Sequence, residues 1–122
     1  MAKKGTLLPG SAELLLLSLL SEGEMYGYQM SEELRRRSDG TFEMKAGTLY
    51  PILHGMEQAG RVESFEKEGE PSGRPRRYYR ITRAGRAALA EQRQEWKRLA
   101  AAVDAVLGET ASRRPLAEGG AC

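Results

Sequence analysis

The sequence has few of the residues that most often carry catalysis or bind metals, with one cysteine and one histidine among 122 residues. Cys122 has no second cysteine to pair with, which excludes a disulfide-stapled secreted scaffold. His54 has no cysteine near it and no second histidine, so zinc centres and Ser/His/Asp or Cys/His catalytic arrangements lack support. No apolar stretch reaches the roughly 20 residues that span a bilayer. We therefore expect a soluble, cytoplasmic protein without a metal or cofactor.

Phosphate-binding loops and paired catalytic carboxylates are also missing. The 14 glycines form neither G-x-x-x-x-G-K nor a strand-linked G-x-G-x-x-G. Adjacent carboxylates such as Glu32 and Glu33 point in different directions on a helix. One catalytic alternative remains, an acid/base pair of His54 and Glu57, but the i, i+3 spacing is equally typical of a contact on a helix surface. We expect that the protein is not an enzyme.

Charge is nearly balanced over the whole chain, with 19 Lys and Arg against 17 Asp and Glu and a net charge of +2. Its distribution is uneven, because residues 71–86 hold six arginines and no acidic residue, whereas residues 61–70 hold four glutamates. The basic segment is therefore a candidate phosphate-binding surface, with a solvated strand face as the alternative.

Hydrophobic spacing predicts a mainly α protein with a small β-hairpin and a single core of modest size. Ser11 and Thr82 are suited to cap the first and last helices. The predicted order is a flexible arm (1–9), helices at about 11–21, 26–37 and 46–59, a hairpin with arms near 62–65 and 77–81, a helix over 83–107, and a disordered tail (108–122). Residues 10–82 would form one domain, followed by the long helix.

The first and third predicted helices differ in how much surface they must bury. The first has leucine on almost every face and needs cover on several sides, from its own domain or from a second subunit. The third is amphipathic, and its apolar stripe comprises Leu49, Ile52, Leu53, Met56 and Ala59. Its other face carries Thr48, Pro51, Gly55 and Gln58. Pro51 fits this helix only within the first turn or at a local bend.

The last predicted helix carries an apolar seam that its own domain cannot fully cover. Leu89, Trp96 and Val103 are seven residues apart, with Leu99 and Val106 at the intermediate positions of a heptad pattern. A long single helix with such a seam indicates homodimerisation.

Three helices, a hairpin and a long helix in this order indicate a winged helix-turn-helix followed by a dimerisation helix. Several motifs in it resemble one known family. Residues 45–54 read KAGTLYPILH and contain the G-T-L-Y-P signature of the recognition helix of PadR-type transcriptional regulators. The other matching pieces are Tyr26-Gly27-Tyr28, Gly73-Arg74, Arg77-Tyr78-Tyr79, and Ile81-Thr82 with Gly85. The resemblance covers about residues 11–107, and it departs from the family pattern at Gly55, where a long basic residue is common, and at Arg61, where an aliphatic residue is usual.

The resemblance implies a homodimeric repressor that places two recognition helices in successive major grooves of a pseudo-palindromic operator. The chain is similar to the class with a single C-terminal helix, whose members dimerise through that helix and the first one. The implied interface comprises Leu16, Leu89, Trp96, Leu99, Val103 and Val106. Some members of this class bind flat hydrophobic effectors beside a tryptophan, and the implied effector site comprises Leu15, Ser18, Gln92 and Trp96. Trp96 fits equally well as a residue that only fills the dimer core.

The candidate DNA-binding residues combine the start of the third helix with the hairpin. A helix N-terminus favours anions, so Thr48 and Tyr50 can reach phosphate or base edges, with His54 one turn later. Basic side chains neutralise backbone phosphate. The full set is Tyr28, Lys45, Thr48, Tyr50, His54, Lys67, Arg74, Arg76 and Arg77. Two alternatives stay open: Tyr50 as a boundary core residue, and a winged-helix module that docks an acidic protein in place of DNA.

Overall fold

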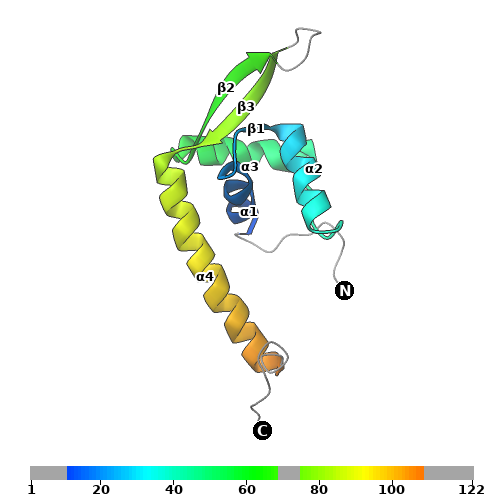
Figure 1. The fold of residues 1–122 in the computed structure, drawn as a ribbon, viewed down its shortest axis with the longest axis vertical. Coiled ribbons are helices and arrows are strands. Elements are labelled where there is room, and N and C mark those ends of the chain that lie inside the picture. Colours follow the sequence, from blue (N-terminus) through cyan, green and yellow to red (C-terminus); the bar gives the residue numbers. More distant parts are fainter. Residues whose placement is uncertain (1–10, 69–74, 109–122) are drawn as a thin grey trace. The chain divides into compact units, whose positions relative to one another are not determined.

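The computed structural model describes residues 11–68 and 75–108. The expected arm, nearly all of the expected tail, and Arg74 lie outside these residues. The elements in chain order are α1 (Ser11–Leu20), β1 (Met25–Tyr26), α2 (Gly27–Arg37), α3 (Ala46–Gln58), β2 (Val62–Glu68), β3 (Pro75–Ile81) and α4 (Arg83–Leu107) (Figure 1). The chain divides into two compact units, Met1–Leu89 and Ala90–Cys122, so that α4 crosses the boundary between them. Among the described residues, no helix is both long and apolar enough to cross a membrane.

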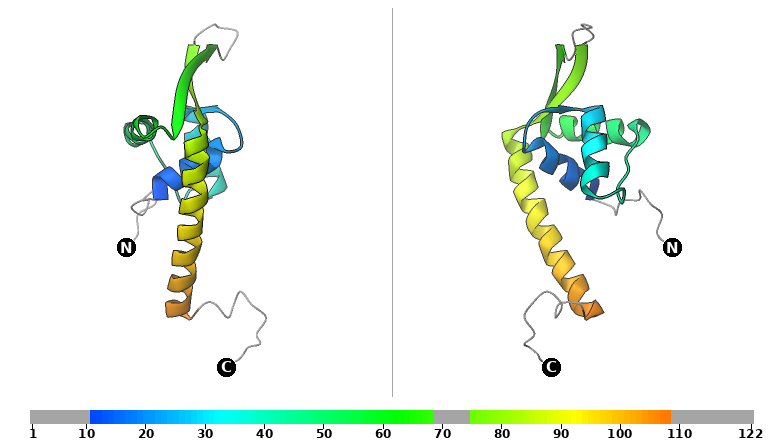
Figure 2. Two further views of the ribbon diagram at one scale, coloured as in Figure 1. Left: turned by 90° about the vertical axis from the view of Figure 1, so that its left-hand side faces the viewer. Right: turned by 45° about the vertical axis from the view of Figure 1, so that its right-hand side comes forward.

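The first unit combines three helices with a small antiparallel sheet. The strands lie in the order β1-β3-β2, and the β2–β3 hairpin extends beyond α1, α2 and α3 (Figure 2). Val62 pairs with Ile81 at the base of the hairpin, and Glu68 pairs with Pro75 at its far end. This mostly helical architecture with a small sheet confirms the predicted fold class.

The core of the first unit forms around α1. Leu16, Leu17, Leu19 and Leu20 are all at most 4% exposed, and they pack with buried side chains of the other elements, namely Met30, Leu34, Met44, Leu49, Leu53, Met56, Val62, Tyr79 and Leu89. Leu14 and Leu15 are only partly buried. Most of the leucine-rich surface of α1 is therefore covered by its own unit, without a second subunit.

The structure confirms the expected helices and the hairpin, and it adds a strand. Each helix ends within a residue or two of its expected position. The added strand β1 pairs with β3 through Met25 opposite Tyr79 and Tyr26 opposite Tyr78. Two residues are too few to show a periodic pattern, so only the neighbouring edge of β3 makes this segment recognisable as a strand.

Pro51 lies in the second turn of α3 rather than the first, so of the two placements predicted from the sequence only the local bend is left. Proline has no N–H group, and the carbonyl of Gly47 loses its usual helical donor there. Both residues are exposed, which lets water satisfy that oxygen. The same exposed face of α3 carries Thr48, Gly55 and Gln58, as predicted from the sequence.

Two side chains join the hairpin base to the helices. The Thr82 hydroxyl accepts a hydrogen bond from the Gly85 amide at 3.0 Å, which confirms the predicted cap of α4, and donates to the Gly60 carbonyl at 2.6 Å. Arg61, where the family pattern has an aliphatic residue, forms an ion pair with Glu13 of α1 at 2.7 Å. A half-buried ion pair therefore joins the base of the wing to α1.

Candidate nucleic-acid interface

The N-terminal ends of α2 and α3 present exposed side chains. Lys45 precedes α3 in an extended conformation, and both Lys45 and Thr48 are exposed. Tyr28, in the first turn of α2, is 64% exposed, and Tyr50 is 42% exposed. Helix N-termini carry a partial positive charge that favours anions. Four of the predicted DNA-binding side chains are therefore accessible near helix starts.

Two adjoining hollows connect these side chains. A hollow of about 280 Å³ and a smaller one of about 110 Å³ are both lined by Tyr28, Ser31 and Ala46. Lys45 lines the larger hollow, and Tyr50 lines the smaller one. The shared lining makes them one continuous surface between α2 and the start of α3.

Tyr50 is both packed and exposed, a position compatible with both of its alternative roles. A Cβ atom built on Gly27 would lie 2.1 Å from the Tyr50 hydroxyl oxygen, which shows how closely the ring lies over the start of α2. The remaining exposed part of the ring is available to a ligand. His54 lies one turn later on α3 and is exposed.

The outer face of the wing, defined here as the sheet face that carries Phe65 and Tyr78, holds two of the predicted basic residues. Lys67 forms an ion pair with Glu24 at 2.5 Å, and its ammonium lies 4.7 Å from the centre of the Tyr78 ring. The hydrogen bond to Glu24 raises the pKa of Lys67. The Arg76 guanidinium lies 4.5 Å from the centre of the Tyr26 ring. Both cations are held against aromatic rings.

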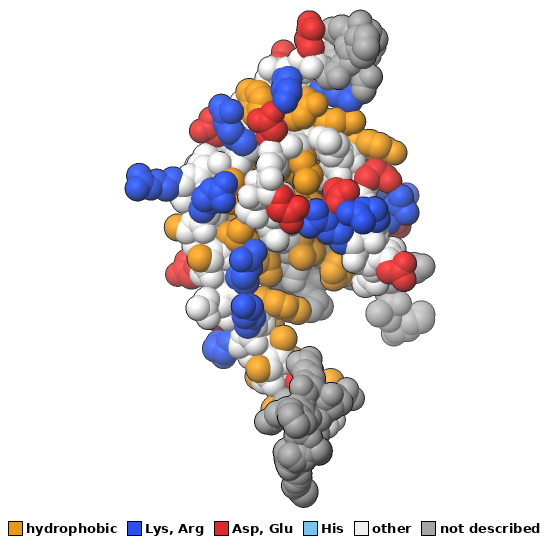
Figure 3. Space-filling view, viewed as in Figure 1, with side chains coloured by type: hydrophobic (Ala, Val, Ile, Leu, Met, Phe, Trp, Pro, Cys, Tyr) orange, Lys and Arg blue, Asp and Glu red, His pale blue; other side chains and the backbone are white. Residues whose placement is uncertain are grey.

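Strand alternation divides the basic segment between two faces. Arg76 and Arg80 lie on the outer face, whereas Arg77 lies on the inner face with Ser64. Arg80 is also paired with Glu63 at 3.4 Å, because the acidic strand β2 lies beside the basic strand β3. Acidic and basic side chains accordingly lie next to one another over the sheet and α2 (Figure 3). The arginines therefore do not form one continuous phosphate surface.

The candidate effector residues fall in different units. Leu15 and Ser18 line a largely apolar hollow of about 280 Å³ in the first unit, together with Leu19, Leu34, Arg37, Ser38 and Phe42. Gln92 and Trp96 belong to the second unit, and Trp96 is 41% exposed.

The expected dimer interface divides into buried and exposed residues. Leu16 is 0% exposed and Leu89 is 6% exposed, and both belong to the core of the first unit. A side chain already enclosed by its own chain offers no surface to a partner, so these two residues are corrected from interface to core. Trp96, Leu99 and Val103 are 41–46% exposed, and Val106 is 86% exposed.

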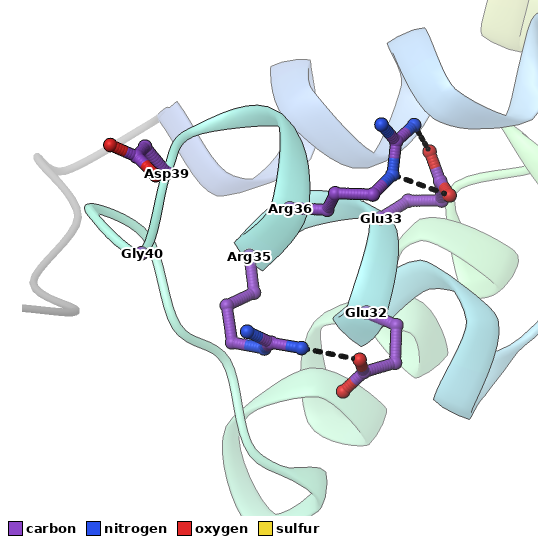
Figure 4. Close-up of a pocket in the computed structure, with 6 residues that line it drawn as sticks. All are labelled: Glu32, Glu33, Arg35, Arg36, Asp39 and Gly40. Atoms are coloured by element: carbon purple, nitrogen blue, oxygen red, sulfur yellow. Dashed lines mark hydrogen bonds and ion pairs between the residues drawn. The ribbon is translucent and has the colours of Figure 1, made fainter.

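A charged hollow of about 400 Å³ lies along α2 and the turn that follows it, lined by Glu32, Glu33, Arg35, Arg36, Asp39 and Gly40 (Figure 4). Its guanidinium groups are paired within the helix, Arg35 with Glu32 at 2.6 Å and Arg36 with Glu33 at 2.8 Å. Hydrogen bonds from Arg36 and Arg37 lower the pKa of Glu33 to about 2. These internal pairs indicate a solvated helix face.

Ser31 lies at the candidate interface but was not predicted from the sequence. The Ser31 hydroxyl donates to the Met44 carbonyl at 2.5 Å and ties α2 to the segment that leads into α3. The two residues are separated by 13 positions, and no local pattern relates them. Only the packing of α2 beside α3 brings them together.

These elements define a winged helix-turn-helix protein. Helices α2 and α3 form the helix-turn-helix, and the β2–β3 hairpin forms the wing. Within the parts of the chain that the structure describes, no group of His, Cys, Asp or Glu is arranged to hold a metal ion.

Comparison with known proteins identifies the family. Residues 16–91 match the transcriptional regulator PadR-like family, and the chain belongs to it. It is 38% identical over 90 residues to the transcriptional regulator Rv3488 of Mycobacterium tuberculosis, covering 74% of this chain and 79% of that protein. The family and this relative are transcriptional regulators rather than enzymes, in agreement with the sequence-based expectation.

Solved structures of similar proteins agree with this assignment. A PadR family transcription regulator from Clostridium difficile is 30% identical, with a TM-score of 0.71 over 80% of this chain and 99% of that one. A PadR-like transcriptional regulator from Bacillus cereus is 31% identical, with a TM-score of 0.70 over 80% of this chain and 92% of that one. Sequence matches and structural matches therefore both support the winged-helix fold and the family assignment.

Proposed function

We propose that this protein is a cytoplasmic, homodimeric repressor that binds double-stranded DNA through α3 and the β2–β3 wing. The observation that carries the proposal is the continuous surface on which Tyr28, Lys45 and Tyr50 meet between α2 and the start of α3. Membership of a family of transcriptional regulators supports it. In this proposal residues 10–82 bind DNA and residues 83–107 dimerise.

In this proposal the exposed face of α3 enters the major groove of the DNA. Thr48, Tyr50 and His54 project from the first turns of α3, as base-contacting residues of a recognition helix do in the major groove. Lys45, Arg76 and Arg77 supply cations for backbone phosphate on either side. Two such helices in a dimer would match a pseudo-palindromic operator.

The first test is binding to DNA upstream of the protein's own gene, compared with unrelated DNA, from about 50 to 200 mM salt. We expect a preference of roughly 1,000-fold or more for the upstream fragment. Lys45→Ala should weaken binding to both DNAs and reduce the slope of log K against log salt by about 0.9 for each phosphate that is no longer neutralised. The matched control is Lys97→Ala, which removes the same charge from α4 and should leave the salt slope unchanged.

Equal and weak binding to both DNAs, without salt dependence, would contradict the proposal. It would favour the alternative of a winged-helix module that docks an acidic protein through the wing. An unchanged salt slope for Lys45→Ala, with wild-type binding intact, would contradict only the role of Lys45.

We also propose that a planar hydrophobic effector releases the repressor from DNA by binding Leu15, Ser18, Gln92 and Trp96. A ligand shifts an equilibrium only through different affinities for two states, so the effector must prefer a dimer that fits the operator poorly. Support comes from the exposed indole of Trp96 and from the apolar hollow beside Leu15 and Ser18.

Trp96 is the only tryptophan, so its fluorescence reports directly on this site. A planar aromatic dye should quench the emission and lower DNA affinity. Trp96→Phe keeps an aromatic face and should retain most of the DNA response, whereas Trp96→Ala should lose it. A folded Trp96→Ala protein that is still released from DNA by the dye would overturn the role of Trp96.

A further inference from the structure

A chain of hydrogen bonds crosses from α3 through β2 to β3. Arg77 Nη1 of β3 donates to Ser64 Oγ of β2 at 2.7 Å, and Ser64 Oγ donates to Glu57 Oε2 of α3 at 2.7 Å. The direction of each bond follows from chemistry, because a guanidinium only donates and a carboxylate only accepts. The single hydroxyl proton of Ser64 therefore points to Glu57, and its lone pair faces Arg77.

The chain lies on the inner face of the wing, the face that packs toward α3. Ser64 pairs directly with Tyr79, which is 4% exposed, and the next inward-facing pair is Val62 with Ile81 at the sheet base. Ser64 and Glu57 are half-buried, whereas Arg77 is exposed. Partial burial strengthens the Ser64–Glu57 bond relative to a similar bond in water, and the exposed Arg77–Ser64 bond is reinforced because the two bonds share a hydroxyl.

Arg77 thus differs from the other arginines of β3. Arg76 lies over the Tyr26 ring, and Arg80 lies over the Phe65 ring on the opposite face of the sheet. Arg77 is tied through Ser64 to the helix that we propose as the recognition helix. A guanidinium has five N–H donors in a planar fork, so a bond to Ser64 still allows the fork to bind a phosphate.

We propose that Ser64 and Glu57 are positioning residues that hold Arg77 in the orientation that binds a DNA phosphate next to α3. This inference rests on the DNA-binding function proposed above. The tether orders the long side chain before DNA arrives, so less side-chain entropy is lost on binding. It also makes the wing and α3 engage DNA as one unit.

The test is a double-mutant cycle with the DNA fragment upstream of the protein's own gene as the probe. Ser64→Ala removes the hydroxyl and should weaken binding about fivefold for each copy of the site, the scale expected when one long side chain must be ordered on binding. In an Arg77→Ala background, Ser64→Ala should have no further effect. In an Arg80→Ala background, the matched control on the outer face, it should keep its full effect.

Two further variants separate positioning from a structural role. Ser64→Thr keeps the hydroxyl on a strand that suits a β-branched residue, and it should restore wild-type affinity. Glu57→Gln keeps an acceptor but removes the charge, and it should give a smaller loss than Ser64→Ala. The thermal midpoint of each variant shows whether the fold is retained.

The possible failures are distinguishable. If the wild type binds DNA and Ser64→Ala weakens binding equally in the Arg77→Ala and Arg80→Ala backgrounds, the positioning role is wrong and the proposed function stands. The same conclusion follows if Ser64→Thr fails to restore affinity while remaining folded. If the wild type shows no salt-dependent binding to either DNA, the proposed function itself fails, and this role with it.

Discussion

Replacing Gly85 with alanine is expected to destabilise the protein by roughly 2–3 kcal/mol, the upper range for overpacking a filled site. A Cβ atom at this position would lie 2.1 Å from the backbone carbonyl oxygen of Arg61 and 2.7 Å from Cγ1 of Ile81. The carbonyl of Arg61 cannot move aside easily, because it accepts a hydrogen bond from the Thr82 amide at 3.0 Å. The start of α4 would have to separate from the base of the wing.

The measurement is the free energy of unfolding in urea, at one fixed protein concentration because the proposed dimerisation would add to apparent stability. Gly55→Ala is the matched control, the same substitution in a helix where nothing lies within 4 Å of the added Cβ. It should stabilise the protein by up to about 1 kcal/mol, the difference in helix propensity between glycine and alanine. If Gly85→Ala and Gly55→Ala change the free energy of unfolding equally, the carbonyl of Arg61 does not restrict the residue at position 85.

Introducing two glutamates into the α4 seam, by Leu99→Glu and Val103→Glu, is expected to convert the proposed dimer into a monomer. Both side chains are about half exposed in the single chain, at 45% and 46%. They are four residues apart and thus lie on one side of the helix. Charged side chains there would be desolvated against a partner, at a cost that this seam cannot offset.

Monomerisation should also weaken binding to the upstream DNA fragment by on the order of 100-fold or more, because two linked half-sites bind far more tightly than one. Sedimentation equilibrium measures the association state, and a titration of the DNA measures the affinity. Ala101→Glu with Ala105→Glu is the matched control, with the same charge change and spacing on the opposite, exposed face of α4. A double seam variant that remains a dimer would place the interface elsewhere.

The local elements could be predicted because their causes are local. The stripe of Leu49, Leu53 and Met56 predicts α3, and each of these residues is at most 3% exposed. The hydroxyl of Thr82 predicts the start of α4 from a cap that involves only the next three residues. The signature at residues 45–54 predicts the family, and the family match over residues 16–91 confirms it.

The sequence could not predict which apolar side chains remain available to a partner. Leu16 and Leu99 are both leucines in apolar helical patterns, yet one is fully buried and the other is 45% exposed. The difference depends on which elements close around each residue. Periodicity identifies an apolar face and does not say what covers it.

Residue types and spacing by themselves determined the helices, the wing, the family and the set of candidate DNA-binding residues. Only the tertiary structure decided which of these candidate residues lie close together in space. It separated Arg76 from Arg77 by the alternation of one strand, and it joined Arg77 to Glu57 of α3 through Ser64. The physical reason is that helix and strand preferences arise over a few neighbouring residues, whereas burial, ion pairing and hydrogen-bonded chains depend on residues that only the folded chain brings together.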